Sequence, residues 1–169
     1  MALLFGGVIL VGFQRLLELR HSRRNERRLR VRGAVERGTG HYPLMFAIHA
    51  LWLPSTLIEG LLRGPEFPAW WPVPFVLFLL AQATRYWAIL SLRDNWNVRI
   101  LVVPGMKLVR RGPYKYFPHP NYVAVAAEVL TFPLIFGAWI TALVFTVLNA
   151  GFLILRIRKE EQALRELAG

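Results

Sequence analysis

The sequence predicts an all-α integral membrane protein with five transmembrane helices, of which the last two form a helical hairpin. Three observations carry this prediction. The chain is 55% hydrophobic and yet has a net charge of +11, a combination unusual for a soluble domain. Its basic residues are concentrated in three segments, 20–37, 93–115 and 156–165. The remaining stretches are apolar over lengths that can cross a bilayer, for which a helix needs about 20 residues.

Four apolar regions supply the spans. The last of them, 122–157, is too long for a single crossing, and Pro133 and Gly137 lie near its middle. Proline removes a backbone donor and glycine favours turns, so we expect two helices there. The predicted spans cover residues 2–19, 42–62, 70–92, 122–136 and 138–157. Little remains outside them, so residues 1–169 are expected to form one membrane-embedded domain.

The distribution of positive charge predicts the orientation. With five spans, the loops after the first and third spans and the C-terminal segment share one side of the membrane. They hold eight, six and four of the 21 Lys and Arg residues, with the C-terminal count taken from Arg156 at the end of the last span, whereas the loop after the second span holds one. Cytoplasmic loops carry an excess of positive charge, so we expect these segments in the cytoplasm and the N-terminus outside. The basic run 20–37 is expected to lie as an amphipathic helix on anionic lipid head groups.

Composition excludes several classes of function. The chain has no cysteine, which rules out disulfides, thiolate metal sites and a cysteine nucleophile. Its four histidines are scattered and match no zinc spacing, so we expect no metal. Strong positive charge would suit nucleic acid, but nucleic-acid domains do not carry several bilayer-length apolar runs. The first run lacks a basic n-region and a small-residue cleavage site, so we expect a retained span rather than a signal peptide.

Charged residues inside the predicted spans form a second group of candidates. A charge at mid-bilayer costs about 2.5–3.5 kcal/mol on insertion scales, so such residues usually face the bundle and have a partner. Arg85 lies midway along the third span and Glu128 two turns into the fourth. They form either a buried ion pair or part of a polar cavity for an amphiphile's head group. On the last helix, Asn149, Arg156 and Glu160 share a face, and Arg156 with Glu160 could equally be an ordinary surface pair.

The connection between the third and fourth spans carries most of the remaining chemistry. Its sequence is Gly112-Pro113-Tyr114-Lys115-Tyr116-Phe117-Pro118-His119-Pro120-Asn121-Tyr122. The density of prolines excludes a helix over its first part. The segment is either a proline-stiffened turn or a ligand-binding loop in which tyrosine and histidine supply the polar groups.

Three motifs taken together resemble a known family. They are Gly112-Pro113-Tyr114, His119-Pro120-Asn121-Tyr122 and the segment from Arg156 to Leu164, which contains Glu160 and Glu161. The pattern is similar to that of the isoprenylcysteine carboxyl methyltransferase family, which has Gly-Pro-Tyr, then Arg-His-Pro-x-Tyr, then an arginine and paired glutamates on the last helix. One position departs from it, because Pro118 stands where the family has arginine. Either contact with the cofactor carboxylate is weaker, or Lys115 or Arg111 replaces that cation.

More narrowly, the chain resembles the bacterial branch that O-methylates alkylpyrones and alkylresorcinols made by type III polyketide synthases. This likeness covers nearly the whole chain and extends to Arg15–Leu19, Ser22–Asn25, Gly33–Glu36, His41–Pro43 and Pro133-Leu134. It implies a bacterial cell membrane, with a lipophilic small molecule and membrane lipid as partners and no nucleic acid or metal.

The resemblance also implies S-adenosylmethionine as the methyl donor, although the chain has no Gly-rich strand-to-helix loop of the soluble type. In the family, the cofactor is held by the segment that corresponds here to residues 112–122, which we call the Pro-rich loop, and by the glutamate-bearing end of the last helix. Both would face the cytoplasm here. The cofactor candidates carried over by position are Tyr114, His119, Pro120, Asn121, Tyr122, Glu160 and Glu161.

A mechanism follows as a hypothesis. Methyl transfer needs an aligned and ionised oxygen nucleophile in a water-excluded site. Arg156 is suited to orienting an anionic acceptor, and Glu128 is the candidate base for a phenolic one, since a phenol titrates near 10. The amphiphile would enter from the bilayer. Three alternatives stay open: a prenylcysteine carboxyl methyltransferase, a non-enzymatic module that binds lipid or a partner protein, and an NADPH-dependent membrane reductase.

Overall fold

The structure is a computed structural model that describes residues 1–64 and 67–167. Residues 65, 66, 168 and 169 of the predicted single domain lie outside this part. Within it the chain forms five α-helices, α1 (Ala2–Val31), α2 (Tyr42–Arg63), α3 (Pro72–Leu92), α4 (Pro120–Ile135) and α5 (Trp139–Leu167). Shorter elements are the strands β1 (Val35–Arg37) and β2 (Ile100–Val102) and the 3-10 turns η1 (Thr39–His41), η2 (Arg93–Asn95) and η3 (Gly112–Lys115).

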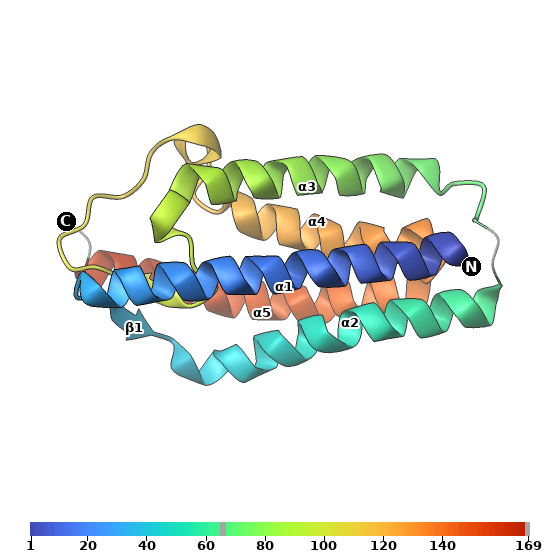
Figure 1. The fold of residues 1–169 in the computed structure, drawn as a ribbon, viewed down its shortest axis with the longest axis horizontal. Coiled ribbons are helices and arrows are strands. Elements are labelled where there is room, and N and C mark those ends of the chain that lie inside the picture. The colour runs from blue at the N-terminus through green and yellow to red at the C-terminus, as the bar shows by residue number, and fades with distance from the viewer. Residues whose placement is uncertain (65–66, 168–169) are drawn as a thin grey trace.

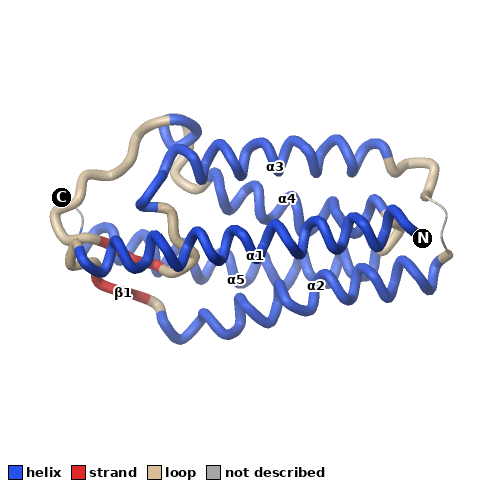
Figure 2. Tube along the Cα trace, in the orientation of Figure 1, coloured by secondary structure: helices blue, strands red, loops and turns tan. Residues whose placement is uncertain are grey.

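The helices run along the length of an elongated bundle (Figure 1). The N-terminus lies at one end, together with the end of α2, the start of α3 and the α4–α5 connection. The two strands and the long connection between α3 and α4 lie at the other end (Figure 2). We call this second end, formed by residues 32–41 and 93–119, the loop end. The predicted Pro-rich loop belongs to it.

Four helices, α1, α2, α3 and α5, are long and apolar enough to cross a membrane. They expose large apolar side chains that a water-soluble bundle would bury, among them Leu10, Leu51, Leu80 and Val147. The prediction of a predominantly helical integral membrane protein is therefore confirmed. The fold is not purely helical, however, because β1 and β2 pair antiparallel at the loop end.

Helix α4 has 16 residues and is about 24 Å long at 1.5 Å per residue, less than the roughly 30 Å of a hydrocarbon core. It packs between α3 and α5 and is largely buried. Pro133 lies within its last turn and does not break it. The chain reverses instead at Gly137, whose φ of +72° favours glycine.

Helix α1 is longer than its predicted span, which ended at residue 19. It continues to Val31, and the chain then turns at Gly33, where φ is +81°. The predicted amphipathic segment is thus an extension of α1, and it packs on protein along one face. Asn25 Nδ2 donates to the carbonyl oxygens of Arg93 and Trp96 at 3.1 and 2.8 Å, and the Val98 amide donates to Ser22 Oγ at 2.9 Å. These bonds hold residues 93–98 against α1.

The strand pair ties the loop end together. Glu36 of β1 accepts hydrogen bonds from Arg99 and Arg30, each at 2.5 Å. Burial alone would raise the pKa of Glu36, but the two guanidinium groups outweigh it and lower that pKa overall. Strand β2 also packs on Ala163 of α5. The segment around β2 is therefore fixed by α1, β1 and α5 together.

Candidate functional site

The Pro-rich loop is anchored to the end of α3. Arg111 Nε donates to the Ser91 carbonyl oxygen at 2.7 Å, and the next residue, Gly112, has a φ of +58°. A Cβ at Gly112 would collide with the Ser91 side chain and lie 3.2 Å from Trp87 Nε1. Only glycine therefore fits this turn, both by conformation and by space.

Replacing Gly112 by alanine is expected to destabilise the protein by at least the roughly 1–2 kcal/mol that a left-handed conformation costs an L-residue, because the clash with Ser91 adds to it. Gly105→Ala is the matched control, since Gly105 has a φ of +73° but nothing within 4 Å of the added Cβ. Thermal unfolding in detergent measures both. Equal midpoints for the two variants would contradict the close approach to α3.

Helix α4 begins where the loop ends. Pro120 is its first residue, a position that proline favours because the missing N–H would have no partner there. His119 precedes it and stacks on Tyr122, with ring centroids 5.3 Å apart. Its Nε2 lies 3.3 Å from Glu161 Oε1. The loop and the last helix, 42 residues apart in sequence, are thus in contact.

Arg156, Tyr122 and Glu160 form a chain of hydrogen bonds. Arg156 Nε donates to the Tyr122 hydroxyl at 2.8 Å, and that hydroxyl donates to the Glu160 carboxylate. Tyr122 therefore links the two residues that sequence spacing placed on one face of the helix. A second nitrogen of Arg156 donates to the Val98 carbonyl oxygen at 2.5 Å and a third lies 3.5 Å from Met45 Sδ.

A cavity of about 450 Å³ lies between the Pro-rich loop, β2 and the end of α5, and we call it the polar cavity because it has more charged and polar side chains on its wall than the second cavity described below. Six of the seven predicted cofactor residues line it; the seventh, Pro120, is buried beneath them. Burial, and to a lesser degree the Glu160 carboxylate, raises the pKa of Tyr114, so its phenol is neutral at physiological pH. The lining residues from the predicted set are Tyr114, His119, Asn121, Tyr122, Glu160 and Glu161.

Neither neighbour named as a replacement for the family arginine lines this cavity. Lys115 does not line this cavity, and Arg111 is bound to the end of α3. Arg110, Arg99 and Arg165 line it instead. Arg110 directly precedes Arg111, so a residue of the same loop brings positive charge to the cavity wall.

A second cavity of about 560 Å³ lies deeper in the bundle and is mostly apolar. Helices α1 and α2 form most of its wall, and α4 and α5 close it. Helix α2, which contains Pro54, diverges from α1 toward the loop end (Figure 1). Polar groups on this wall include His49, Arg15, Glu18 and Arg85. Sequence reasoning did not single out His49, because one histidine in a span has no informative spacing.

The two cavities share part of their walls. The residues that line both are Trp96, Asn97, Asn121, Tyr122 and Arg156. Asn121 Oδ1 is buried and makes no hydrogen bond to any part of the chain that the structure describes. An amide oxygen left unpaired in such a place costs free energy unless a ligand donates to it. The shared wall therefore presents an unpaired amide oxygen and a guanidinium where the two cavities adjoin.

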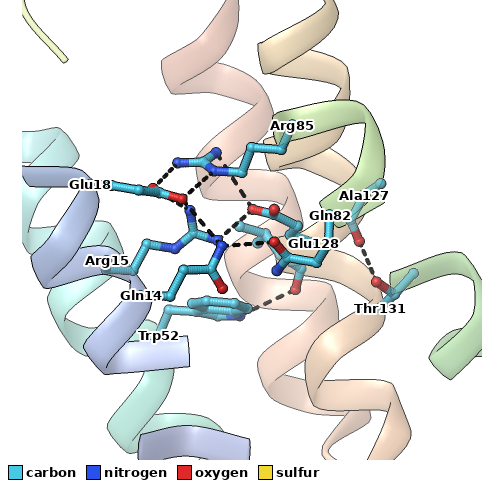
Figure 3. A network of polar contacts seen from close by, with 10 residues as sticks. Gln14, Arg15, Glu18, Trp52, Gln82, Arg85, Ala127, Glu128 and Thr131 are labelled. Atoms are coloured by element: carbon cyan, nitrogen blue, oxygen red, sulfur yellow. Dashed lines mark hydrogen bonds and ion pairs between the residues drawn. The ribbon is translucent and has the colours of Figure 1, made fainter. Parts of the chain in front are cut away.

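The buried charges form one cluster instead of a simple pair (Figure 3). Arg85 from α3 donates to both oxygens of Glu18 from α1, at 3.0 and 2.6 Å, and lies 3.6 Å from Glu128. Arg15 lies 2.8 Å from Glu18 and 2.7 Å from Glu128. The predicted Arg85–Glu128 contact exists, but Glu18 is the closer partner. Sequence reasoning did not single out Arg15 or Glu18 for this cluster.

Two predicted polar residues of the spans lie away from the shared wall. Glu128 is 2% exposed, bound to arginines, and lines neither of these two cavities. Asn149 is 1% exposed and also lines neither. Arg156, by contrast, lines both. The structure thus brings Arg156 together with the cofactor candidates and leaves Glu128 in the ion cluster.

Comparison with known proteins identifies the family of the chain. The model of the isoprenylcysteine carboxyl methyltransferase (ICMT) family matches residues 74–166. The chain belongs to this family. As an ICMT-family protein with several membrane-spanning helices, it is a membrane methyltransferase. The matched segment contains every residue of the predicted cofactor set, and it begins after α1 and α2, which form most of the apolar cavity.

Two relatives are similar to this chain over 90% of its length. The uncharacterized protein YpbQ of Bacillus subtilis (strain 168) is 42% identical over 153 residues, which is 90% of this chain and 91% of the relative. An uncharacterized protein of Haemophilus influenzae is 28% identical over 154 residues, or 90% of each chain. No solved structure matches the chain significantly. The family prediction is confirmed, and the branch within the family is a matter of proposal.

Proposed function

We propose that this ICMT-family protein is an S-adenosylmethionine-dependent O-methyltransferase whose acceptor is the hydroxyl of a long-chain alkylpyrone or alkylresorcinol. The observation that carries the proposal is the shared wall of Trp96, Asn97, Asn121, Tyr122 and Arg156 between a polar and an apolar cavity. A methyltransferase for lipophilic acceptors needs this arrangement, because the cofactor is polar and its partner is not.

The polar cavity suits the cofactor by charge and by hydrogen bonding. S-adenosylmethionine, when bound, supplies an activated methyl group on a sulfonium. Glu160 and Glu161 offer negative charge for its cationic groups, and Arg110 offers positive charge for its carboxylate. Asn121 Oδ1 is an unpaired acceptor for an N–H or O–H donor, and Tyr114 adds an aromatic ring with a neutral hydroxyl.

The apolar cavity suits an acceptor with a long alkyl chain. The chain would lie between α1 and α2, where side chains such as Val8, Phe46 and Leu53 form the wall, and would enter from the bilayer. The head group would face Arg156. A guanidinium has five N–H donors, and the structure gives three of its nitrogens one protein partner each, so two donors remain for an acceptor oxygen. Glu128 would then act through Arg15 and Arg85 as a positioning residue.

The proposal includes an orientation. The loop end, which carries most of the positive charge, would lie in the cytoplasm of a bacterial cell and give the cofactor access from there. The N-terminus would lie outside, and α4 would complete a five-helix arrangement by pairing with α5 as a hairpin. Because α4 is short, its ends would lie within the protein, where other helices cover them.

The test is methyl transfer from labelled S-adenosylmethionine by detergent-purified protein. The acceptors are long-chain alkylpyrones, long-chain alkylresorcinols and a prenylcysteine analogue, with His119→Ala as the control variant. We expect label in a pyrone or resorcinol and its loss in the variant. Label only in the prenylcysteine analogue would indicate a carboxyl methyltransferase. Absence of both transfer and cofactor binding would favour a binding module, and NADPH binding would indicate a reductase.

Cofactor affinity gives a second prediction. Glu160→Gln is expected to raise the Kd for S-adenosylmethionine at least tenfold, because a hydrogen bond to a charged group is worth about 1.5–3 kcal/mol. Glu166→Gln is the matched control, since Glu166 lies on the same helix, is exposed, and lines neither cavity. Isothermal titration measures both. Equal affinities for the two variants would remove Glu160 from the cofactor site.

A further inference from the structure

We propose that His49 is the general base that takes the proton from the acceptor hydroxyl, and that it thereby equips this site for phenolic acceptors. The proposal rests on the methyl transfer proposed above and adds a residue to it. It also distinguishes between the two acceptor classes. An acidic enol is largely ionised at neutral pH, whereas a phenol with a pKa near 10 is not and needs a base.

The hydrogen bonding of His49 determines which ring nitrogen is free. His49 Nδ1 lies 2.9 Å from the carbonyl oxygen of Met45, one turn earlier on α2. A carbonyl oxygen only accepts, so Nδ1 carries the hydrogen in this contact. In the neutral ring, Nε2 then has an unshared electron pair. No hydrogen bond to Nε2 occurs within residues 1–64 and 67–167.

His49 lies on the wall of the cavity that we propose for the acceptor. Its side chain lines the apolar cavity, as do Met45 and Arg156. Arg156 approaches Met45 Sδ at 3.5 Å, and His49 follows Met45 by four residues on the same face of α2. The base and the guanidinium that would orient the acceptor oxygen therefore line the same cavity, and both contact Met45.

The other titratable groups on this cavity are already engaged or unsuited. Glu18 on α1 is bound by Arg85 on α3 and by Arg15. Tyr122 on α4 donates to Glu160 and accepts from Arg156 on α5. Tyr42, on the same helix as His49, has no nitrogen base and lies under the Arg99 guanidinium. His49 is thus the group in this described wall that offers an unused basic nitrogen.

The proton step is simple. The acceptor O–H bond breaks and its electron pair stays on oxygen, while an N–H bond forms at Nε2 to give an imidazolium. The free donors of Arg156 stabilise the oxyanion. After the methylated product leaves, the imidazolium returns its proton to water, and the neutral ring is restored with its Met45 hydrogen bond intact.

The test uses His49→Asn, because the asparagine amide can still donate to the Met45 carbonyl oxygen but has no nitrogen base. Each protein is assayed with two acceptors of equal chain length, an alkylresorcinol and a ring-nitrated analogue that is already ionised at the assay pH. We expect turnover of the resorcinol to fall by about 10²–10⁴ in the variant. Turnover of the ionised analogue should stay within a few-fold of wild type, which a purely structural defect would not allow.

A second readout does not depend on turnover. In protein labelled with ¹⁵N-histidine, the Nε2 resonance that is missing from His49→Asn should shift when alkylresorcinol is added without cofactor. An unshifted resonance, unchanged resorcinol turnover, or an equal loss with both acceptors would overturn the role of His49 while leaving the methyltransferase proposal standing. A wild-type protein that transfers methyl to no acceptor would instead overturn the proposed function and this role with it.

Discussion

Arg156→Ala is expected to lower kcat/KM for methyl transfer by about 10²–10³, the range seen when one preorganised donor to a developing charge is removed. The variant loses the two donors that would hold the acceptor oxygen. It also leaves the Tyr122 hydroxyl and the Val98 carbonyl oxygen without the partner they have at 2.8 and 2.5 Å. Because Arg156 lines both cavities, the expected defect covers chemistry as well as acceptor binding.

Arg156→Lys is the informative companion. An ammonium keeps the charge but cannot reproduce the planar set of contacts to Tyr122, Val98 and the acceptor. We expect it to recover less than a tenth of the lost activity. Arg158→Ala serves as the control, since Arg158 is exposed on the same helix and lines neither cavity. Steady-state kinetics on folded, detergent-purified protein decides, and near-normal turnover in Arg156→Ala would remove this residue from the mechanism.

The second large effect concerns stability. Glu18→Leu is expected to destabilise the protein by about 3–5 kcal/mol, because it leaves Arg85 and Arg15 with only Glu128 as a counter-charge in a buried place. The double variant Glu18→Leu/Arg85→Leu should be more stable than the single one. Removing an opposite charge along with the first restores neutrality, and apolar groups of similar size fit the site.

An exposed ion pair provides the comparison. Asp94→Asn removes a partner of Arg28 at 2.5 Å, but the two side chains are 58% and 47% exposed, so the expected cost is at most about 1 kcal/mol. Unfolding in mixed detergent micelles measures all the variants. A single Glu18→Leu variant as stable as Asp94→Asn would show that the cluster is not energetically coupled.

The predicted parts of the fold rest on local signals. Apolar length predicted the long helices, and the resemblance at Tyr122, His119 and Glu160 predicted which distant segments meet. We predicted that the first span ends at residue 19, whereas α1 continues to Val31. Gly33, a residue type that often follows the end of a helix, indicated the true end. The polar residues before Gly33 concealed the continuation, because one face of this part of α1 packs on residues 93–98. The strands were missed because three residues are too few to show an alternating pattern.

The partners within the site depend on tertiary packing and were harder to predict. Glu18 pairs with Arg85 across 67 residues of sequence and Arg15 with Glu128 across 113. Nothing local distinguishes these choices from the expected Arg85–Glu128 pair. Trp96 and Asn97 lie in an irregular segment without periodicity, and their place on the shared wall depends on the hydrogen bonds that α1 and Arg156 make to residues 93–98.

The wall shared by the two cavities has a thermodynamic consequence. Side chains such as Asn121 and Arg156 face both compartments, so an adjustment to one occupant alters the surface presented to the other. Linkage requires such coupling to be mutual: whatever factor the first ligand applies to the affinity of the second, the second applies to the first. Under the proposed function, an acceptor that tightens the binding of the methyl donor would itself be held more tightly, by the same factor, once the donor is in place.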